Sequence, residues 1–182
     1  MYEVDSLDRV IELHDAPRPD IGAPLPLILC DEGHLLLAYL VSEPDPKWDG
    51  SYATGVSPES EGMAVACVRF HWPSAHMFGP PNDEAFSGHP LASRGLQPYA
   101  VFEIGDSSWI RKLERMNSVH PRHNRERFLA GRRHFVFAFH DSTFECVAEG
   151  FESEVFRGSM RSALTRMAAR CRRGRANQRH TR

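Results

Sequence analysis

Apolar and polar residues alternate along 133–148 as they do in the two strands of an antiparallel hairpin. Phenylalanines at every second position give RHFVFA one apolar face, and TFECVA carries a second such face. With Asp141-Ser142 as a two-residue turn, Phe137 would face Cys146 and the two apolar faces would coincide. A shift by one residue would place phenylalanine against threonine or glutamate. The pattern predicts a β-hairpin, with a loop of three or four residues as the alternative to the two-residue turn.

Other apolar segments predict strands at 8–15, 63–72 and 100–105, and a second hairpin over 25–41. We expect Gly33 to supply a positive φ in the turn of this second hairpin. Residues 42–62 are rich in proline, glycine, serine and acidic residues, which is typical of a loop. Residues 72–99 contain five prolines and no sustained period, which predicts a long irregular loop of a kind that often carries function.

One amphipathic helix is predicted after residue 106. Asp106 or Ser107 can cap its N-terminus, and four apolar residues then share one stripe: Trp109, Ile110, Leu113 and Met116. Residues 120–131 predict a loop with one helical turn. A second helix can begin near residue 156, where apolar residues recur every three or four positions, and disorder is expected past Gly174.

Together these elements predict one β-rich α+β domain over residues 1–156, with hairpins and one amphipathic helix. Residues 157–182 are predicted to form a basic arginine-rich tail, part helical or disordered. A chain of 182 residues is long enough for a substantial core. Its apolar runs are too short for a membrane span, and its first residues lack the apolar core of a signal peptide, so we expect a cytoplasmic location.

Charge is unevenly distributed, although the net charge is only −2. All 24 acidic residues lie at or before Glu154, whereas nine arginines and no acidic residue occupy 157–182. Residues 107–135 form a second basic segment, with eight Arg or Lys and two Glu. Such clusters of positive charge are typical of proteins that bind nucleic acid, because they neutralise its phosphates. The alternatives are that the arginines of the second segment form only a solvated helix face, and that the tail lies against the acidic half of the chain.

The chemistry of the predicted turn centres on a histidine. His140 and Asp141 are the candidate catalytic residues, with the alternative that Asp141 only bonds the turn backbone. Four more residues are candidates for ligand binding, on condition that their loops converge on the turn: His89, Arg94, Arg122 and His123.

No metal site and no cofactor are assigned. His134 and His140 share a strand face but lie six residues, or about 20 Å, apart. The four cysteines have no CxxC spacing and are expected to be free thiols, three of them buried in strands. The sequence contains no GxGxxG, no GxSxG and no GxxxxGK followed by Ser or Thr, so it lacks the corresponding nucleotide-binding and hydrolase signatures.

Three segments carry a resemblance. HPLASRGLQPYAVFEI, SSWIRKLERMNSVHPRH and HFVFAFHDSTFECVA together resemble a family of small uncharacterised bacterial proteins, over roughly residues 86–150. The resemblance implies that the three segments belong to one unit. It implies no activity, fold or catalytic residue.

Three functional hypotheses follow. The first is a non-enzymatic binding or interaction module that takes a protein partner or associates with itself, because the charge is split and no catalytic motif is assembled. The second is a His-dependent enzyme, assisted by a metal ion or not, whose site gathers the histidines around His140. The third is a nucleic-acid binder that uses the basic segments 111–133 and 157–182.

Overall fold

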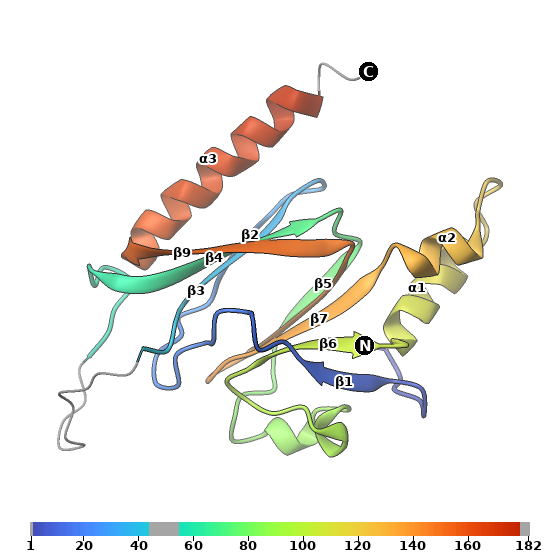
Figure 1. The fold of residues 1–182 in the computed structure, drawn as a ribbon, viewed down its shortest axis with the longest axis horizontal. Coiled ribbons are helices and arrows are strands. Elements are labelled where there is room, and N and C mark those ends of the chain that lie inside the picture. The colour runs from blue at the N-terminus through green and yellow to red at the C-terminus, as the bar shows by residue number, and fades with distance from the viewer. Residues whose placement is uncertain (1, 44–54, 179–182) are drawn as a thin grey trace.

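The computed structural model describes residues 2–43 and 55–178, with side chains described as far as residue 171. These residues form two antiparallel sheets that face each other across a shared core (Figure 1). The five-stranded sheet has the order β1 (Arg9–Glu12), β6 (Val101–Gly105), β7 (Arg133–Ala138), β8 (Thr143–Ala148) and β5 (Ala75–Gly79). The four-stranded sheet has the order β2 (Leu27–Cys30), β3 (Leu35–Leu40), β4 (Met63–His71) and β9 (Gly150–Gly158).

Two segments of the chain pass from one sheet into the other at a shared corner. β4 leads into β5 through residues 72–74, and β8 leads into β9 through Glu149. The backbone N–H of Ser74 donates to the carbonyl of Val147 at 2.7 Å, and the N–H of Glu149 donates to the carbonyl of His71 at 2.8 Å. Backbone pairing therefore continues around the bend, and the two sheets are joined through a single ribbon.

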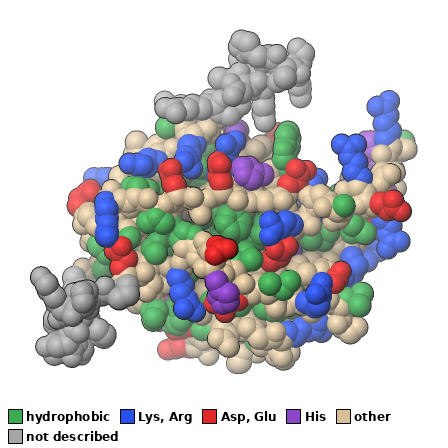
Figure 2. Space-filling view, viewed as in Figure 1, with side chains coloured by type: hydrophobic (Ala, Val, Ile, Leu, Met, Phe, Trp, Pro, Cys, Tyr) green, Lys and Arg blue, Asp and Glu red, His purple; other side chains and the backbone are tan. Residues whose placement is uncertain are grey.

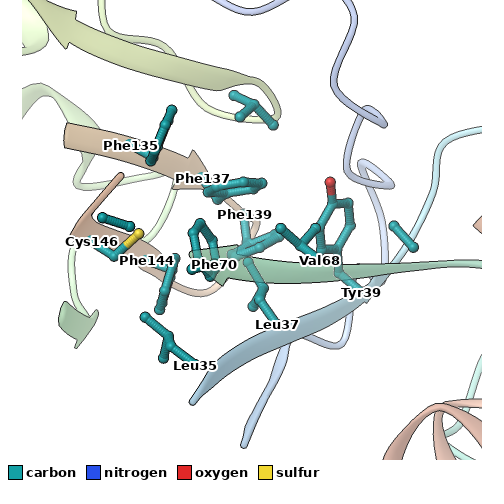
Figure 3. Close-up of a cluster of buried hydrophobic side chains, with 13 residues drawn as sticks. Leu35, Leu37, Tyr39, Val68, Phe70, Phe135, Phe137, Phe139, Phe144 and Cys146 are labelled. Atoms are coloured by element: carbon teal, nitrogen blue, oxygen red, sulfur yellow. The ribbon is translucent and has the colours of Figure 1, made fainter. Parts of the chain in front are cut away.

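The core between the sheets is built mainly of aromatic side chains. Figure 3 shows Phe70 of β4 against the phenylalanines of β7 and β8, which the alternation of those strands turns inward. The ring centroids of Phe70 and Phe144 are 5.5 Å apart, and those of Phe137 and Phe144 are 6.0 Å apart. Such tilted and edge-on pairs are the arrangements that aromatic rings prefer.

Helices and loops cover the outer faces of both sheets. Helix α3 (Met160–Gln178) lies on the four-stranded sheet, where its buried side chains pack on Leu36, Ala38 and Cys67: Met160, Ala163 and Met167. On the five-stranded sheet lie helix α1 (Ser108–Asn117), the short helix α2 (Arg125–Ala130) and the N-terminal residues. Residues 86–99, which contain the 3₁₀ turns η1 (Phe86–Gly88) and η2 (Ala92–Arg94), cover the rest of that sheet.

The predicted β-rich α+β class is confirmed, and so are the two hairpins and the amphipathic helix α1. The predicted register of the β7–β8 hairpin is wrong by two residues. Phe137 pairs with Phe144 rather than Cys146. The connection is the four-residue loop 139–142, which was the predicted alternative to the two-residue turn. A slip by two residues keeps every side chain on its face, so alternation alone cannot detect it.

Three further expectations need correction. Gly33 does not have a positive φ. The Asp31 carboxylate holds that turn instead, because it accepts hydrogen bonds from the N–H groups of Gly33 and His34 at 2.8 and 2.9 Å. The predicted loop 72–99 contains strand β5, and strand β9 was missed.

The predicted boundary of the tail at 156/157 falls within β9, and α3 follows directly. Of the predicted loop 42–62, residues 44–54 lie outside the described residues. No helix in the described part of the chain is both long and apolar enough to cross a membrane.

Replacing Phe137 by alanine is expected to lower the free energy of unfolding by about 3–5 kcal/mol, because the substitution leaves a cavity in a fully buried core. Urea unfolding at neutral pH measures this loss. Phe78→Ala on the edge strand β5 is the matched control, since that ring is 48% exposed, and it should cost less than half as much. Equal losses would contradict the described packing.

Candidate functional site

A buried carboxylate lies on the outer face of the five-stranded sheet. Glu145 of β8 accepts hydrogen bonds from three side chains that come from distant parts of the chain. The Tyr2 hydroxyl donates at 2.6 Å, the His134 Nε2–H at 2.9 Å and the His89 Nε2–H at 3.2 Å. Each of these four residues is less than 9% exposed, so the cluster has almost no contact with solvent.

The second ring nitrogen of each histidine also has a partner, which for His89 settles its role as a donor. Nδ1 of His89 accepts from the backbone N–H of Leu91 at 3.1 Å, which leaves the proton on Nε2. Nδ1 of His134 lies 2.9 Å from the hydroxyl of Ser107, the residue that caps α1 by accepting from the Ile110 N–H. The cluster therefore fixes the N-terminus of α1 on strand β7.

The carboxylate of Glu145 is held ionised. Burial by itself would raise its pKa, but the hydrogen bonds from His134, His89 and Tyr2 outweigh burial and lower the pKa to about 2. Burial, together with the nearby Glu145 charge, raises the pKa of Tyr2, so the phenol keeps its proton and remains a donor. This arrangement is a structural clamp, because a ligand has no direct access to its polar atoms.

A second histidine–carboxylate pair lies at the β7–β8 loop. Nδ1 of His140 is 2.9 Å from Oδ2 of Asp83, and the Tyr99 hydroxyl donates to the same carboxylate. The Tyr99 bond is the main cause that lowers the pKa of Asp83, and the His140 bond adds to it. Asp141, the partner expected from the sequence, is exposed. Nε2 of His140 has no hydrogen-bond partner within residues 2–43 and 55–178, and the side chain is 39% exposed.

The predicted site residues are distributed over separate places. His89 belongs to the Glu145 cluster, while Arg94 donates to the backbone carbonyl of Asp8 at 2.9 Å. His123 binds Glu114 at 2.8 Å and lies with Arg122 beside Glu149, at the opposite end of β8 from the 139–142 loop. Thr143 and Glu149 are about 20 Å apart along an extended strand. The structure therefore does not gather His140, Asp141 and the four ligand-binding candidates into one site.

Arg122 and His123 instead line an open pocket of about 490 Å³ between the end of α1, helix α2 and the end of β8. Its walls also include His120, Arg127, Phe128 and Arg132. The His123–Glu114 bond holds the α1–α2 loop, because Glu114 is buried on α1. We call this cavity the basic pocket.

Arg132 stands between the basic pocket and the sheet. Its Nη1 donates to Glu149 at 2.9 Å, and its guanidinium lies 5.3 Å from the centroid of the Phe128 ring. Its Nε is buried and has no partner among the described residues. The guanidinium groups of Arg122 and Arg127 are exposed and have no ion pair or hydrogen bond with the described part of the chain.

Figure 2 shows Lys and Arg side chains gathered at the end of the molecule that α1 and α2 form. The basic segment 107–135 predicted this concentration, but the partners of individual arginines come from remote segments. The sequence contains no pattern that would identify Tyr2, Asp83 or Tyr99 as partners of these histidines and carboxylates. Within the described residues, no three His, Cys, Asp or Glu side chains are grouped to hold a metal ion.

No known protein family, curated protein or solved structure matches the chain significantly. The resemblance to small bacterial proteins therefore stays a prediction, and the site must be judged on its geometry.

Glu145→Gln should lower the free energy of unfolding at pH 7 by about 3 kcal/mol, because the pKa of Glu145 falls from its ordinary 4.5 to about 2 on folding. A lowered folded pKa stabilises the fold above pH 4.5, and that contribution is lost as the pH falls towards 2. The difference between wild type and variant in urea unfolding should shrink over this interval.

The matched control is Glu126→Gln on α2, where the carboxylate is exposed. This variant should stay close to wild type at every pH. A constant difference for Glu145→Gln across the whole interval would show that its carboxylate is not stabilised by folding.

Proposed function

We propose that the chain is a binding module for nucleic acid and that the basic pocket contacts the phosphate backbone. The observation that carries the proposal is the pair of exposed guanidinium groups, those of Arg122 and Arg127, which line this pocket and have no ion pair among the described residues. A phosphate oxygen is the acceptor that such donors bind most strongly, since the guanidinium is planar and always charged.

The local electrostatics support an anionic ligand. Two acidic side chains near the pocket already have partners, because Glu149 pairs with Arg132 and Glu114 lies 2.8 Å from His123 and 3.9 Å from Arg125. His120 adds an exposed imidazole to the same walls. The excess charge therefore lies on groups that are free to move towards a ligand.

Apolar surface adjoins this charge. Val119, in the loop that carries His120, is 87% exposed. An exposed apolar side chain beside unpaired arginines suits a ligand that offers sugars and bases as well as phosphates. An acidic protein would interact only with the charged side chains. The binding experiment below distinguishes such a protein from nucleic acid.

A protein partner or a second copy of the chain stays a prediction, as does the cytoplasmic location. Helix α3 occupies the four-stranded sheet, so the basic segment after residue 157 lies on a different layer from the basic pocket. The two basic segments therefore need not serve the same ligand.

The full chain should bind fluorescein-labelled oligo(dT), with an affinity that falls linearly in a log–log plot as salt rises from ~50 to ~200 mM. The Arg122→Gln/Arg127→Gln double variant should bind at least about 10-fold more weakly at the lower salt, with a slope reduced by about 1.4, because two phosphate contacts are lost. Fluorescence anisotropy measures both quantities.

The control is Arg9→Gln/Arg69→Gln, which removes the same charge from β1 and β4 and should keep the wild-type slope. Equal losses in the two double variants would show a general charge effect and would overturn the basic pocket as the site. Binding of poly-glutamate in place of the oligonucleotide would assign the pocket to an acidic protein.

A further inference from the structure

A second open pocket, of about 670 Å³, lies along α1. The N-terminal residues Glu3, Val4 and Asp5 form one wall, and α1 forms the other. The α1 residues that line it are Ser108, Arg111, Lys112, Arg115 and Met116. None of these residues belongs to the basic pocket, so the two cavities are separate sites.

Ser108 is the first indication that this cavity takes a ligand. The residue is only 6% exposed, and its hydroxyl has no hydrogen-bond partner among the described residues. Its backbone N–H is satisfied by the Asp8 carboxylate at 2.6 Å, so the hydroxyl alone is left over. The neighbouring Ser107 hydroxyl, in contrast, bonds both His134 and the Ile110 N–H. Buried hydroxyls are normally partnered, and an unpartnered one that lines a cavity indicates a missing polar group.

The charges around the pocket are of both signs. Arg111 is neutralised by Asp5 and also donates to the carbonyl of Asp106. The carboxylate of Glu3 and the guanidinium of Arg115 line the pocket and have no ion pair with the described part of the chain. A purely anionic ligand would meet the Glu3 carboxylate, and a purely cationic one would meet Arg115. A ligand that carries one charge of each sign satisfies both.

The dimensions of the pocket and its apolar surface further restrict which ligands fit. Ser108 and Arg115 are seven residues apart on α1, a rise of about 10 Å, and an extended tripeptide spans about the same length. Val4 and the 65%-exposed Met116 add apolar surface to the same cavity. A volume of about 670 Å³ lies within the range of small-ligand pockets.

We propose that this pocket binds a short peptide with free termini. The peptide carboxylate pairs with Arg115, its ammonium group pairs with Glu3, and Ser108 bonds a polar group of the peptide backbone. An apolar side chain of the peptide packs on Met116. Capture of a C-terminal carboxylate or an N-terminal amine is an established mode of peptide recognition. The proposal assigns a small-molecule site to the chain in addition to its proposed nucleic-acid surface.

Isothermal titration of the full chain with the tripeptide Ala-Leu-Ala tests the proposal. The peptide should bind in a saturable 1:1 manner. Its N-acetyl form, which lacks the ammonium group, and its C-terminal amide, which lacks the carboxylate, should each bind at least about 10-fold more weakly. Equal binding of the N-acetyl form, or no binding of the free peptide, overturns the proposal.

Variants locate the site. Glu3→Gln and Arg115→Gln should each weaken Ala-Leu-Ala at least about 10-fold, whereas Arg122→Gln in the basic pocket should leave peptide binding unchanged. Ser108→Ala should also weaken the peptide while the melting temperature of the free protein stays equal or rises, because the unpartnered hydroxyl is removed. Unchanged binding in Glu3→Gln and Arg115→Gln overturns the assignment to this pocket.

Discussion

The buried carboxylate of Glu145 is the interaction on which the outer side of the five-stranded sheet depends. A charged group in such a place is tolerated only when its hydrogen bonds are complete. Here the donors come from the N-terminal segment, from the 86–99 cover and from β7, so one anion draws three segments onto one strand. Removing any donor would leave the charge partly unsatisfied, which makes the three segments interdependent.

Both candidate pockets depend on this clamp. Tyr2 holds the N-terminal wall of the pocket that contains Ser108, and its ring stacks on Trp109 of α1 with centroids 5.4 Å apart. His134, through the Ser107 cap, fixes the beginning of α1. The far end of the same helix then positions the basic pocket. A helix that is anchored at its first turn can thus line one pocket along its length and border the other at its last residue, Asn117.

The sequence predicted the fold class and most of the strands because alternation and apolar runs are local signals. The prediction failed where flanking residues obscured the alternation of a strand, or where a shift by two residues left the alternation unchanged. Proline-rich flanks hid β5, and the charged residues of the edge strand β9 hid its pairing with β4. The basic segment 107–135 pointed correctly to where arginines gather. Which arginines remain unpaired depended on Asp5 and Glu149, and no local pattern links those acids to α1 or to Arg132.

The corner at which β4 becomes β5 and β8 becomes β9 has a consequence for how the molecule loses its structure. Each of these two segments is hydrogen-bonded in both sheets, so neither sheet can come apart without withdrawing strands from the other. The aromatic core between them is shared in the same way. Opening should therefore be all-or-none for the two sheets, as in a single cooperative unit. Local opening is left to the outer helices and covering segments, which is where both proposed ligands bind.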